Sequence, residues 1–553
     1  MTDYERLAEL LFPNTDKTPE YYEELYPPRG LAEGARVTRF APSPTGFMHM
    51  GNMYSAFIDK LNADTTGGIF YLRIEDTDKK REVEGGISKI LTDLKTFGIV
   101  PDEGMTGENE QKGDYGPYQQ SKRKDIYQCF VKELVKKGLA YPCFCSEEEI
   151  SALREKQEKD GVTPGYYKEY ARCRTLSADE QTEKIKSGAP YVIRLRSDGD
   201  ENKKIFVYDL IKGKIEMPEN VQDLVLLKRD GIPTYHFAHA VDDHLMRTTH
   251  VVRGDEWIAS LPIHIQLFSV LGFKPPKYIH ISPLMKMDGE SKRKLSKRKD
   301  PELAVSFYAE QGYPKESVLE YLLTLANSNF EDWRKTNKTA PQSDFPFNVK
   351  KMSPSGAIFD LVKLDDISKN IISVMDAGTV YERICEWAKA NDPDFFAVFT
   401  ENPERSRAMV NIDRESPKPR KDIAKWSEVK QYFSYLFNEY YTPDLTLPEN
   451  ISTADAAAIL NAYSEIYDEN DSRDEWFEKV KSVCEPLGFT ANVKEYKQNP
   501  DAFKGHVGDV STVIRIAVTS RRNTPDLCSI MQLMGKQEAL ARLHEAAEAY
   551  TKR

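Results

Sequence analysis

Two short segments, far apart in the chain, carry residue types that suit the binding of a nucleoside triphosphate. The segment RFAPSPTGFMHMGN (39–52) places an apolar strand before a Pro/Ser/Thr/Gly turn, and His49 then opens a predicted helix. Backbone N–H groups at a helix start favour a phosphate, the histidine adds a hydrogen-bond donor, and Gly51 lets a flat ring lie against bare backbone. The segment KLSKR (294–298) supplies lysines that suit a departing polyphosphate. In this order, the two segments predict the two walls of one ATP site.

Several charged residues in or beside apolar strands suit the binding of an amino acid. Glu75 follows the second predicted strand and could bind a substrate ammonium group, although a surface capping carboxylate is an equally simple interpretation. Arg39 and Arg253 must be paired if they are buried, because an unpaired buried guanidinium is costly. They could pair with a nearby carboxylate of the chain, or they could clamp a substrate that has two carboxylates. Tyr235 and His239 follow the returning strand and could line the same crevice.

Cys143, Cys145 and Cys173 raise the question of a zinc site, because a C-x-C pair and a later cysteine supply three soft ligands. A complete structural site would have four Cys or His ligands, and Thr175 stands where a C-x-H pattern would place a histidine. The pattern therefore leaves two interpretations open, a zinc site and a cysteine-lined knuckle without metal.

The elements around these residues alternate between strand and helix. From Arg36 the pattern predicts a strand (RVTRFA), a helix (NMYSAFIDKLNADTT) and a second strand (GIFYLRIED), as in a doubly wound parallel sheet. Between about Tyr141 and Met217, a charged helix and a hairpin-like segment predict an inserted α+β module. The α/β rhythm then returns with a short helix (AVDDHLM) and the strands HVVRG and KYIHISPL. We predict one Rossmann-type α/β domain split by this insertion and followed, after Pro301, by all-α domains.

Length and composition are typical of a soluble protein with several domains. The 553 residues exceed what one core usually holds, and no apolar run is long enough to span a bilayer. The N-terminus lacks an uninterrupted apolar stretch, and the seven scattered cysteines fit reduced thiols in a cytoplasm. The formal net charge of −11 argues against a nucleic-acid partner, but phosphate binding depends on local patches, and the segment 286–299 is rich in Lys and Arg.

Five segments of the chain resemble the signatures of one family. FAPSPTG with HMGN, and KLSKR, are similar to the two signatures of the class I aminoacyl-tRNA synthetases, and RIEDTD, PTYHFAHAVDD and VVRGDEW are similar to the pattern of bacterial-type glutamyl-tRNA synthetases. The likeness continues more weakly through SPSGAIFDLVKL and TPDLCSIMQLMGKQEALARL, which look like anticodon-binding bundles. This helical half disfavours glutaminyl-tRNA synthetase, whose anticodon region is built of β-barrels. Asn52 and Arg298 depart from the general signatures, but both changes occur within the family.

The resemblance implies that glutamate is activated by ATP and Mg²⁺ to glutamyl-adenylate and is then transferred to the terminal adenosine of tRNA. The ATP site would be formed by Pro42, Thr45, Gly46, His49, Gly51, Asn52, Lys294, Ser296 and Lys297. Of these, His49, Lys294 and Lys297 would be catalytic, and Lys297 would stabilise the pentavalent phosphate as pyrophosphate leaves.

The resemblance also implies the residues of the glutamate pocket. Arg39 and Tyr235 would contact the side-chain carboxylate, and Arg253 would contact the α-carboxylate. Glu75 would bind the ammonium group. The pocket would be completed by Ser43, His239 and Trp257.

The implied domain order gives each part of the chain a place, although the N-terminal extension receives no role. The segments are an N-terminal extension (1–35), the first half of the Rossmann catalytic domain (36–120), an inserted acceptor-binding module (121–225), the second catalytic half (226–285), a stem-contact domain with the lysine loop (286–350), and two helical anticodon-binding domains (351–450 and 451–553).

We therefore expect a cytoplasmic, monomeric glutamate–tRNA ligase without membrane contact, whose partners are glutamate and tRNA(Glu). A non-discriminating form that also charges tRNA(Gln) stays open, because the sequence does not identify the side chains that read the anticodon. A nucleotidyltransferase that uses no tRNA is disfavoured by the long helical region and the basic segment 286–299. A non-catalytic RNA-binding relative is disfavoured by the presence of His49, Glu75 and Lys297.

Overall fold

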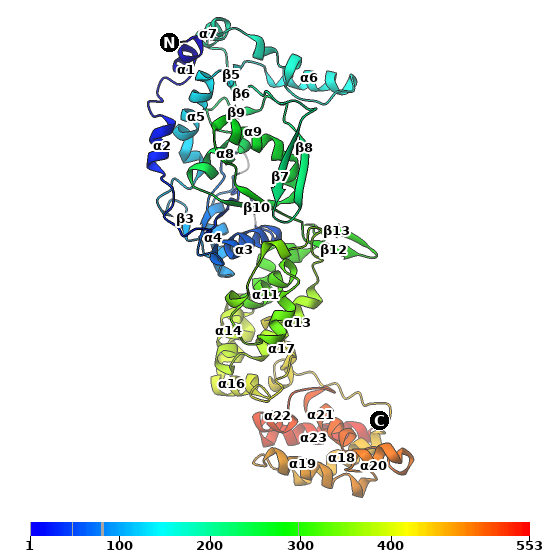
Figure 1. Cartoon of the computed structure of the whole chain (residues 1–553). Helices are drawn as coiled ribbons and strands as arrows, with labels where there is room; N and C mark the ends of the chain where they lie inside the picture. Colours follow the sequence, from blue (N-terminus) through cyan, green and yellow to red (C-terminus); the bar gives the residue numbers. More distant parts are fainter. Residues whose placement is uncertain (1, 47, 79–81, 297, 553) are drawn as a thin grey trace. The chain divides into compact units, whose positions relative to one another are not determined.

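The computed structural model describes residues 2–46, 48–78, 82–296 and 298–552 (Figure 1). Lys297, which we predict to be catalytic, lies outside the described residues. The chain divides into two compact units. The first comprises Met1–Phe307 and Leu319–Asp360, and the second comprises Tyr308–Val318 and Leu361–Arg553.

Parallel strands with helical crossovers form the centre of the first unit. These elements are β1 (Val37–Phe40), α3 (Met50–Asp64), β2 (Ile69–Leu72), α4 (Gly86–Thr96), β3 (Glu103–Met105), β10 (His250–Gly254), α9 (Leu261–Leu271) and β11 (Lys277–Ile281). β1 pairs with β2, β2 with β3, and β10 with β11, each in parallel. The Thr249 N–H donates to the Val37 carbonyl at 3.0 Å, so the later pair continues the earlier one. The predicted Rossmann-type α/β fold is confirmed.

The crossover helix α3 begins at the predicted phosphate turn because His49 caps it. The imidazole Nδ1 of His49 accepts the Asn52 N–H at 3.2 Å, and the Asn52 amide oxygen accepts the His49 N–H at 3.3 Å. This reciprocal cap satisfies two backbone groups that a helix start leaves open. The cap therefore fixes both residues at the edge of the sheet.

The helix that carries Tyr235 is longer than the sequence predicts. The expected short helix AVDDHLM is the second part of α8 (Tyr235–Leu245), so Tyr235 and His239 lie on a helix and do not follow a strand directly. The three- and four-residue spacing places Tyr235, His239, Asp242 and Asp243 on neighbouring faces of this helix. The polar residues concealed the helical period, because on this helix they are buried.

The predicted insertion forms an α+β module. Its elements are α5 (Lys124–Lys136), β5 (Ala140–Cys143), α6 (Glu147–Lys159), α7 (Ala178–Lys186), β6 (Val192–Leu195), β7 (Lys204–Asp209), β8 (Gly213–Pro218) and β9 (Val225–Leu227). The strands β5, β6 and β9 form an antiparallel sheet, and β7 and β8 form a hairpin. The predicted α+β insertion is thus confirmed.

The N-terminal extension forms two helices that pack on the first unit. Helix α1 (Asp3–Leu11) contacts α5 and α7, and α2 (Pro19–Leu25) contacts α5 (Figure 1, blue and cyan). Leu7 and Ala8 are fully buried. The extension therefore belongs to the same body as the catalytic sheet.

Two further parts complete the chain. In the first unit, strand β4 (Gln111–Lys112) extends the sheet at β3. This unit also contains the hairpin of β12 (Met285–Asp288) and β13 (Ser291–Lys294) and the helix α12 (Phe330–Thr336). The chain passes from one unit to the other within α10 (Ser306–Gln311) and α11 (Lys315–Ala326). The helices of the second unit include α13 (Leu361–Ser373), α14 (Ala377–Asn391), α15 (Pro393–Glu401), α16 (Pro403–Asn411), α17 (Val429–Tyr432), α18 (Thr453–Ile466), α19 (Arg473–Ser482), α20 (Val493–Gln498), α21 (Val507–Thr519), α22 (Leu527–Met534) and α23 (Lys536–Thr551).

The second unit has two apolar cores. One centres on buried residues between Ile372 and Phe437, and the other on buried residues between Ile451 and Tyr550. The described part of this unit contains no strand, which confirms the predicted helical C-terminal region. Among the described residues, none of the helices combines the length and apolarity that crossing a membrane requires.

Candidate active site

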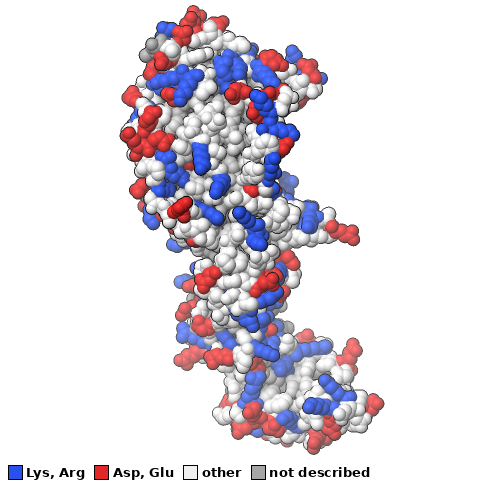
Figure 2. Space-filling model, viewed as in Figure 1, with Lys and Arg blue, Asp and Glu red and all other residues white. Residues whose placement is uncertain are grey.

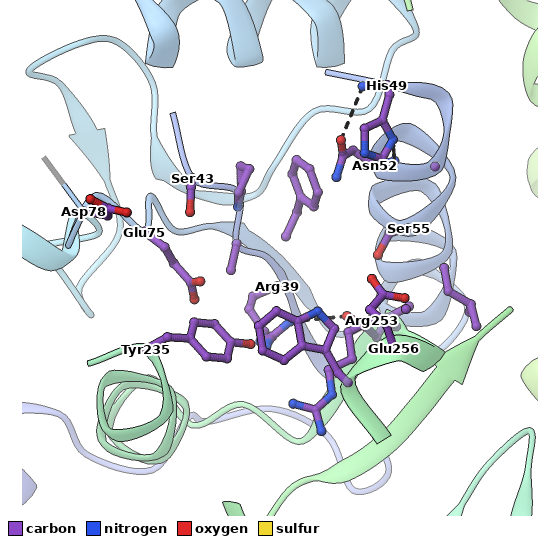
Figure 3. Close-up of a pocket in the computed structure, with 18 of the residues that line it drawn as sticks. Arg39, Ser43, His49, Asn52, Ser55, Glu75, Asp78, Tyr235, Arg253 and Glu256 are labelled. Carbon is purple, nitrogen blue, oxygen red and sulfur yellow. Dashed lines mark hydrogen bonds between the residues drawn. The ribbon is translucent and has the colours of Figure 1, made fainter. Parts of the chain in front are cut away.

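One cavity of about 1170 Å³ in the first unit contains most of the predicted site residues (Figure 3). Its walls include Ala41–Ser43 after β1, Gly254 at the end of β10, and Ser282–Leu284 after β11. The cavity therefore opens at the carboxyl ends of parallel strands, where open α/β sheets bind their ligands. The predicted residues that line it are Arg39, Pro42, Ser43, His49, Gly51, Asn52, Glu75, Tyr235, Arg253, Trp257 and Lys294.

Four of the predicted residues that the structure describes do not line the cavity. Thr45 and Gly46 belong to the turn before His49, and Ser296 follows Lys294; none of the three is part of the wall. His239 is completely buried beneath the wall, with Nδ1 2.8 Å from an Asp243 carboxylate oxygen. Asp243, which is itself fully buried, also forms ion pairs with Arg39 and Arg73.

Arg39 and Glu75 meet at one end of the cavity through buried ion pairs. Arg39 Nε donates to both Asp243 carboxylate oxygens at 3.2 Å, and Arg73 donates to Asp243 at 2.6 Å and to Glu75 at 3.1 Å. Burial opposes ionisation of Asp243, but the two guanidinium groups hold its pKa well below the usual range. Burial raises the pKa of Glu75, because Arg73 and Arg39 offset the lost solvation only in part. Structural pairing of Arg39 is thus real, with Asp243 as the partner.

Arg253 is bound differently. Its Nε donates to His280 Nε2 at 3.0 Å, its Nη1 contacts His264 Nδ1 at 3.0 Å, and its guanidinium lies 4.6 Å from the centre of the Tyr278 ring. Its Nη2 is buried, and no described residue hydrogen-bonds to it. A buried donor without an acceptor is costly, so this position suits a ligand carboxylate.

Tyr235 and Trp257 form the apolar side of the same end. Their rings lie 4.5 Å apart. Figure 3 shows Tyr235, Glu75 and Arg39 at one end of the cavity and His49 with Asn52 at the other. The two ends suit a small charged molecule and a phosphate compound, respectively.

His49 and Lys294, which we predict to bind phosphate, both line the cavity. Backbone pairing joins His49 to Ala304, so the chain that follows the lysine hairpin is attached to the start of α3. Because Nδ1 of His49 accepts the Asn52 N–H, the proton of the neutral ring lies on Nε2. Gly51 lies against the imidazole of His49. A Cβ at this position would come within 3.1 Å of the Nδ1 atom of that ring.

The basic segment 286–299 is partly neutralised. Lys286 pairs with Glu302 and lies 3.4 Å from Asp300, and Arg293 pairs with Asp300 at 2.6 Å. Figure 2 shows blue side chains along the hairpin β12–β13 and red ones at its tip. Among the described carboxylates, none forms an ion pair with Lys294, which lines the cavity. Among the described cations of this segment, Lys294 is therefore the one that is best placed for a phosphate.

Several lining residues were missed by sequence reasoning. Lys228 donates to the Thr77 carbonyl at 2.6 Å, and Asp76 accepts from Ser121 N–H at 2.8 Å. Ser55 and Glu256 also line the cavity. Ser55 lies one helical turn after Gly51 on α3, a spacing that could have indicated it. The position of Lys228 depends on its contact with Thr77, 151 positions away, whereas Glu256 lies directly before the predicted Trp257.

The three predicted cysteines come together in the insertion. Their sulfur atoms lie within 4.8 Å of one another, and Cys145 is 3.6 Å from Cys173. The hydroxyl of Tyr166 lies 3.3 Å from the Cys145 sulfur and accepts the Cys173 N–H at 3.0 Å. The three thiols supply three of the four ligands of a tetrahedral zinc site, and the Tyr166 hydroxyl is the oxygen next to them.

Comparison with known proteins identifies the family. A family model described as tRNA synthetases class I (E and Q), catalytic domain, matches residues 36–366, and one described as an anticodon binding domain matches 380–547. A glutamate–tRNA ligase of Clostridium perfringens is 53% identical over 98% of this chain and 100% of its own length. Another, of Acetivibrio thermocellus, is 48% identical over 98% and 99%.

A solved structure agrees with these relatives. The crystal structure of a glutamate tRNA ligase from Elizabethkingia meningosepticum in complex with its amino acid superposes with a TM-score of 0.74 at 28% identity, covering 93% of this chain and 99% of that one. The chain therefore belongs to the class I aminoacyl-tRNA synthetases, within the glutamate–tRNA ligase family.

Proposed function

We propose that the protein is a glutamate–tRNA ligase, which activates glutamate with ATP to glutamyl-adenylate and transfers glutamate to the 3′-terminal adenosine of tRNA(Glu). The observation that carries the proposal is a single cavity that is lined by Glu75 and Arg253 as well as by His49 and Lys294. Glutamate–tRNA ligases at 53% and 48% identity over nearly the whole chain support it.

The amino-acid end supplies charges that complement glutamate. Glu75 would bind the ammonium group. The positive charge of this group would favour the ionised form of the carboxylate, which burial disfavours. The uncompensated donor of Arg253 would bind a carboxylate, and Arg39 and Tyr235 would bind the second one. Ser43 and Trp257 would complete the wall, and His239 would act from beneath by holding Asp243.

The reaction needs positioning and charge stabilisation. An α-carboxylate oxygen of glutamate attacks the α-phosphorus of ATP, a new P–O bond forms, and the bond to pyrophosphate breaks with its electron pair leaving on pyrophosphate. The Nε2–H of His49 and the ammonium of Lys294 would stabilise the charge on the phosphate oxygens, and we propose the same role for Lys297. In the second step, a terminal ribose hydroxyl of tRNA attacks the carbonyl carbon and AMP leaves.

The wall of the cavity offers carboxylates that a magnesium ion bound with ATP could use. Asp78, Asp230 and Glu256 line it with the hard oxygen ligands that Mg²⁺ prefers, and one or two of them would suffice beside the phosphates. When bound with ATP, this ion would neutralise phosphate charge. The chain's own share of the nucleotide site would be Pro42, Gly51 and Asn52, which hold the turn and the helix start against the nucleotide.

Zinc also fits the cysteine cluster. Cys143, Cys145 and Cys173 would supply three ligands. The Tyr166 hydroxyl would be the fourth, since Thr175 stands where a histidine ligand is expected. A zinc ion there would hold the corner between β5 and the segment around Cys173. Elemental analysis of the purified protein should find about one zinc per chain; Cys173→Ser should lose it, and Cys484→Ser, a buried cysteine of the second unit, should keep it. A zinc-free wild type would favour the metal-free knuckle.

The domain roles follow from the same proposal. The insertion (121–225) would bind the acceptor end, the segment 286–350 the stem, and the helical segments 351–450 and 451–553 the anticodon. The match of residues 380–547 to an anticodon binding domain supports the last of these. We further propose that the enzyme works as a cytoplasmic monomer, and that tRNA(Gln) is the one further tRNA to test as a substrate.

The deciding assay offers purified protein ATP, single amino acids and total tRNA, and identifies the acylated tRNA by sequencing. We expect glutamate on tRNA(Glu). Charging of tRNA(Gln) with glutamate would identify the non-discriminating form, and ATP turnover without acylation would overturn the proposal in favour of a nucleotidyltransferase.

A variant pair tests the amino-acid end. Glu75→Gln should raise the KM for glutamate by at least about tenfold, because losing a charged hydrogen-bond partner in a buried site costs about 1.5–3 kcal/mol. Glu84→Gln, which changes an exposed carboxylate, should leave both KM values unchanged. Equal effects of Glu75→Gln on glutamate and ATP would contradict the assignment.

A further inference from the structure

The buried arginines of the catalytic region differ in what compensates their charge. Arg39, Arg73, Arg123 and Arg253 are all buried. Three of them form ion pairs with carboxylates: Arg39 and Arg73 with Asp243, and Arg123 with Asp242. Among the described carboxylates, none forms an ion pair with Arg253, whose polar contacts are two imidazole rings. Of these four arginines, Arg253 is thus the one whose charge no described carboxylate neutralises.

The hydrogen-bond pattern shows that both imidazoles act as neutral acceptors. A guanidinium can only donate, so Nε2 of His280 and Nδ1 of His264 must accept from Arg253. The proton of His280 then lies on Nδ1, 2.8 Å from an Asp209 carboxylate oxygen, and that of His264 lies on Nε2, 2.9 Å from His236 Nδ1. Each ring is therefore held in one tautomer by a second partner.

Burial favours the neutral form of both rings. It lowers the pKa of His280, with Asp209 opposing the shift. It also holds the pKa of His264 well below its usual value, and the nearby His239 and Arg253 add to the effect. Both rings are consequently uncharged at neutral pH, and neither adds a positive charge beside Arg253.

We propose that His264 and His280 are positioning residues that fix the Arg253 guanidinium while leaving its positive charge for a carboxylate of glutamate. The proposal rests on the proposed function. A carboxylate at either ring position would orient Arg253 equally well, but it would neutralise the charge. A neutral acceptor separates these two effects, and the unpartnered Nη2 marks where an acceptor is missing.

Isosteric variants separate charge from shape. His280→Gln places a neutral amide oxygen near the position of Nε2, whereas His280→Glu places a carboxylate there. In ATP–pyrophosphate exchange, we expect the glutamate KM to rise less than about threefold for Gln and at least about tenfold for Glu, with a nearly constant KM for ATP. Equal increases for Gln and Glu, or no increase for Glu, would overturn the proposal.

A second pair guards against misfolding, because the new carboxylate of His280→Glu would face Asp209. His264→Asn and His264→Asp alter the Nδ1 position, where the neighbouring rings are His236 and His239 and no described carboxylate hydrogen-bonds to His264. The same split between the neutral and the acidic variant is expected. Thermal unfolding of all four variants shows whether they fold; a split only in unfolding temperature would overturn the proposal.

Glutamine identifies which carboxylate Arg253 meets. It keeps the α-carboxylate and lacks the side-chain one. If His280→Glu weakens competitive inhibition by glutamine as much as it weakens glutamate use, Arg253 binds the α-carboxylate. If only glutamate is affected, Arg253 binds the side-chain group. Both results support the proposal, whereas a wild type that exchanges pyrophosphate with no amino acid would refute the proposed function itself.

Discussion

Asp243 is a single buried carboxylate that serves two guanidinium groups and one imidazole. Arg39 and Arg73 reach it at 3.2 and 2.6 Å, and His239 at 2.8 Å. The arrangement links β1, the segment after β2 and helix α8 beneath the cavity. Glu75 is attached to the same group through Arg73 at 3.1 Å. The charge balance of the amino-acid pocket therefore depends on a residue that does not line it.

Asp243→Asn should destabilise the protein by about 3–5 kcal/mol, because it leaves two buried guanidinium groups without their shared charge. Asp59 offers a matched control: it is equally buried, no described cation forms an ion pair with it, and burial holds its pKa well above the usual value. A carboxyl that is already neutral should tolerate Asp59→Asn with little loss. Denaturant unfolding measures both variants, and similar losses would contradict this charge assignment.

His250 provides a test of pH dependence. Burial, together with Arg36 and Lys277, lowers its pKa to about 4, whereas an unfolded histidine titrates near 6.5. Between these values the unfolded state binds the extra proton, so stability falls as the pH drops from about 6.5 to about 4. In His250→Asn, whose amide cannot titrate, the thermal midpoint should depend less steeply on pH over this range. An unchanged slope would show that His250 does not contribute.

The sequence predicted which residues gather at the cavity better than how they are paired. The spacing within 39–52 sufficed for His49, Gly51 and Asn52, because a turn and a helix start are local features. The partner of Arg39 lies 204 positions away, so no local pattern could identify Asp243. The roles of the site residues stay predictions, and that of Lys297 lies outside the described part of the chain.

At the scale of elements, the N-terminal extension contacts both the insertion and the second half of the catalytic region. The Lys132 ammonium on α5 binds Glu9 at 2.6 Å and the Thr15 carbonyl at 2.9 Å. Glu23 accepts from His244 Nε2 and from Arg247, at the end of α8. The extension therefore holds the C-terminal end of α8, and Tyr235 at the N-terminal end of the same helix lines the cavity.

Lys132→Met should loosen the extension, because it leaves buried carbonyl oxygens unpaired at a cost of about 1–3 kcal/mol. Hydrogen exchange of residues 2–35 should increase, and the glutamate KM should rise modestly through α8. Lys136→Met is the control, since its side chain is about a third exposed and contacts Glu9 at 3.4 Å. If both variants exchange alike, Lys132 does not hold the extension.

Elements with a simple period were predictable, and α8 shows why others were not. The parallel strands are continuous apolar runs, which are typical of strands covered on both faces. In α8, His239, Asp242 and Asp243 are buried as a polar layer, so the usual apolar period was absent and the helix start was misplaced. The role of the extension was not predictable, because its contacts are with elements distant in sequence, among them α5 and α7.

At the scale of the whole molecule, an acidic chain must still bind a polyanion. The formal net charge is −11, and Lys286 and Arg293 of the basic segment are already paired with carboxylates. Binding of tRNA therefore depends on cations that remain unpaired, and their effect is screened by salt. The composition alone disfavoured such a partner, whereas the family assignment supports it.

The tRNA affinity should fall steeply and linearly in a plot of log K against log salt, with a slope set by the number of phosphates contacted. Lys292→Gln, on the hairpin strand β13, should reduce the slope by about one if that strand meets a phosphate. Lys552→Gln, at the exposed C-terminal end of α23, should leave it unchanged. A flat response in the wild type would argue against an electrostatic interface.

The backbone pairing of His49 with Ala304 has a consequence for how this enzyme can vary. Residue 294 ends a hairpin strand and residue 304 is tied to the start of α3, so the stretch between them is tethered at both extremities. Lengthening or shortening that stretch by even one position would shift its cations relative to the imidazole. Homologues should therefore keep the length of this stretch, and its positions outside KLSKR should vary more readily than that length.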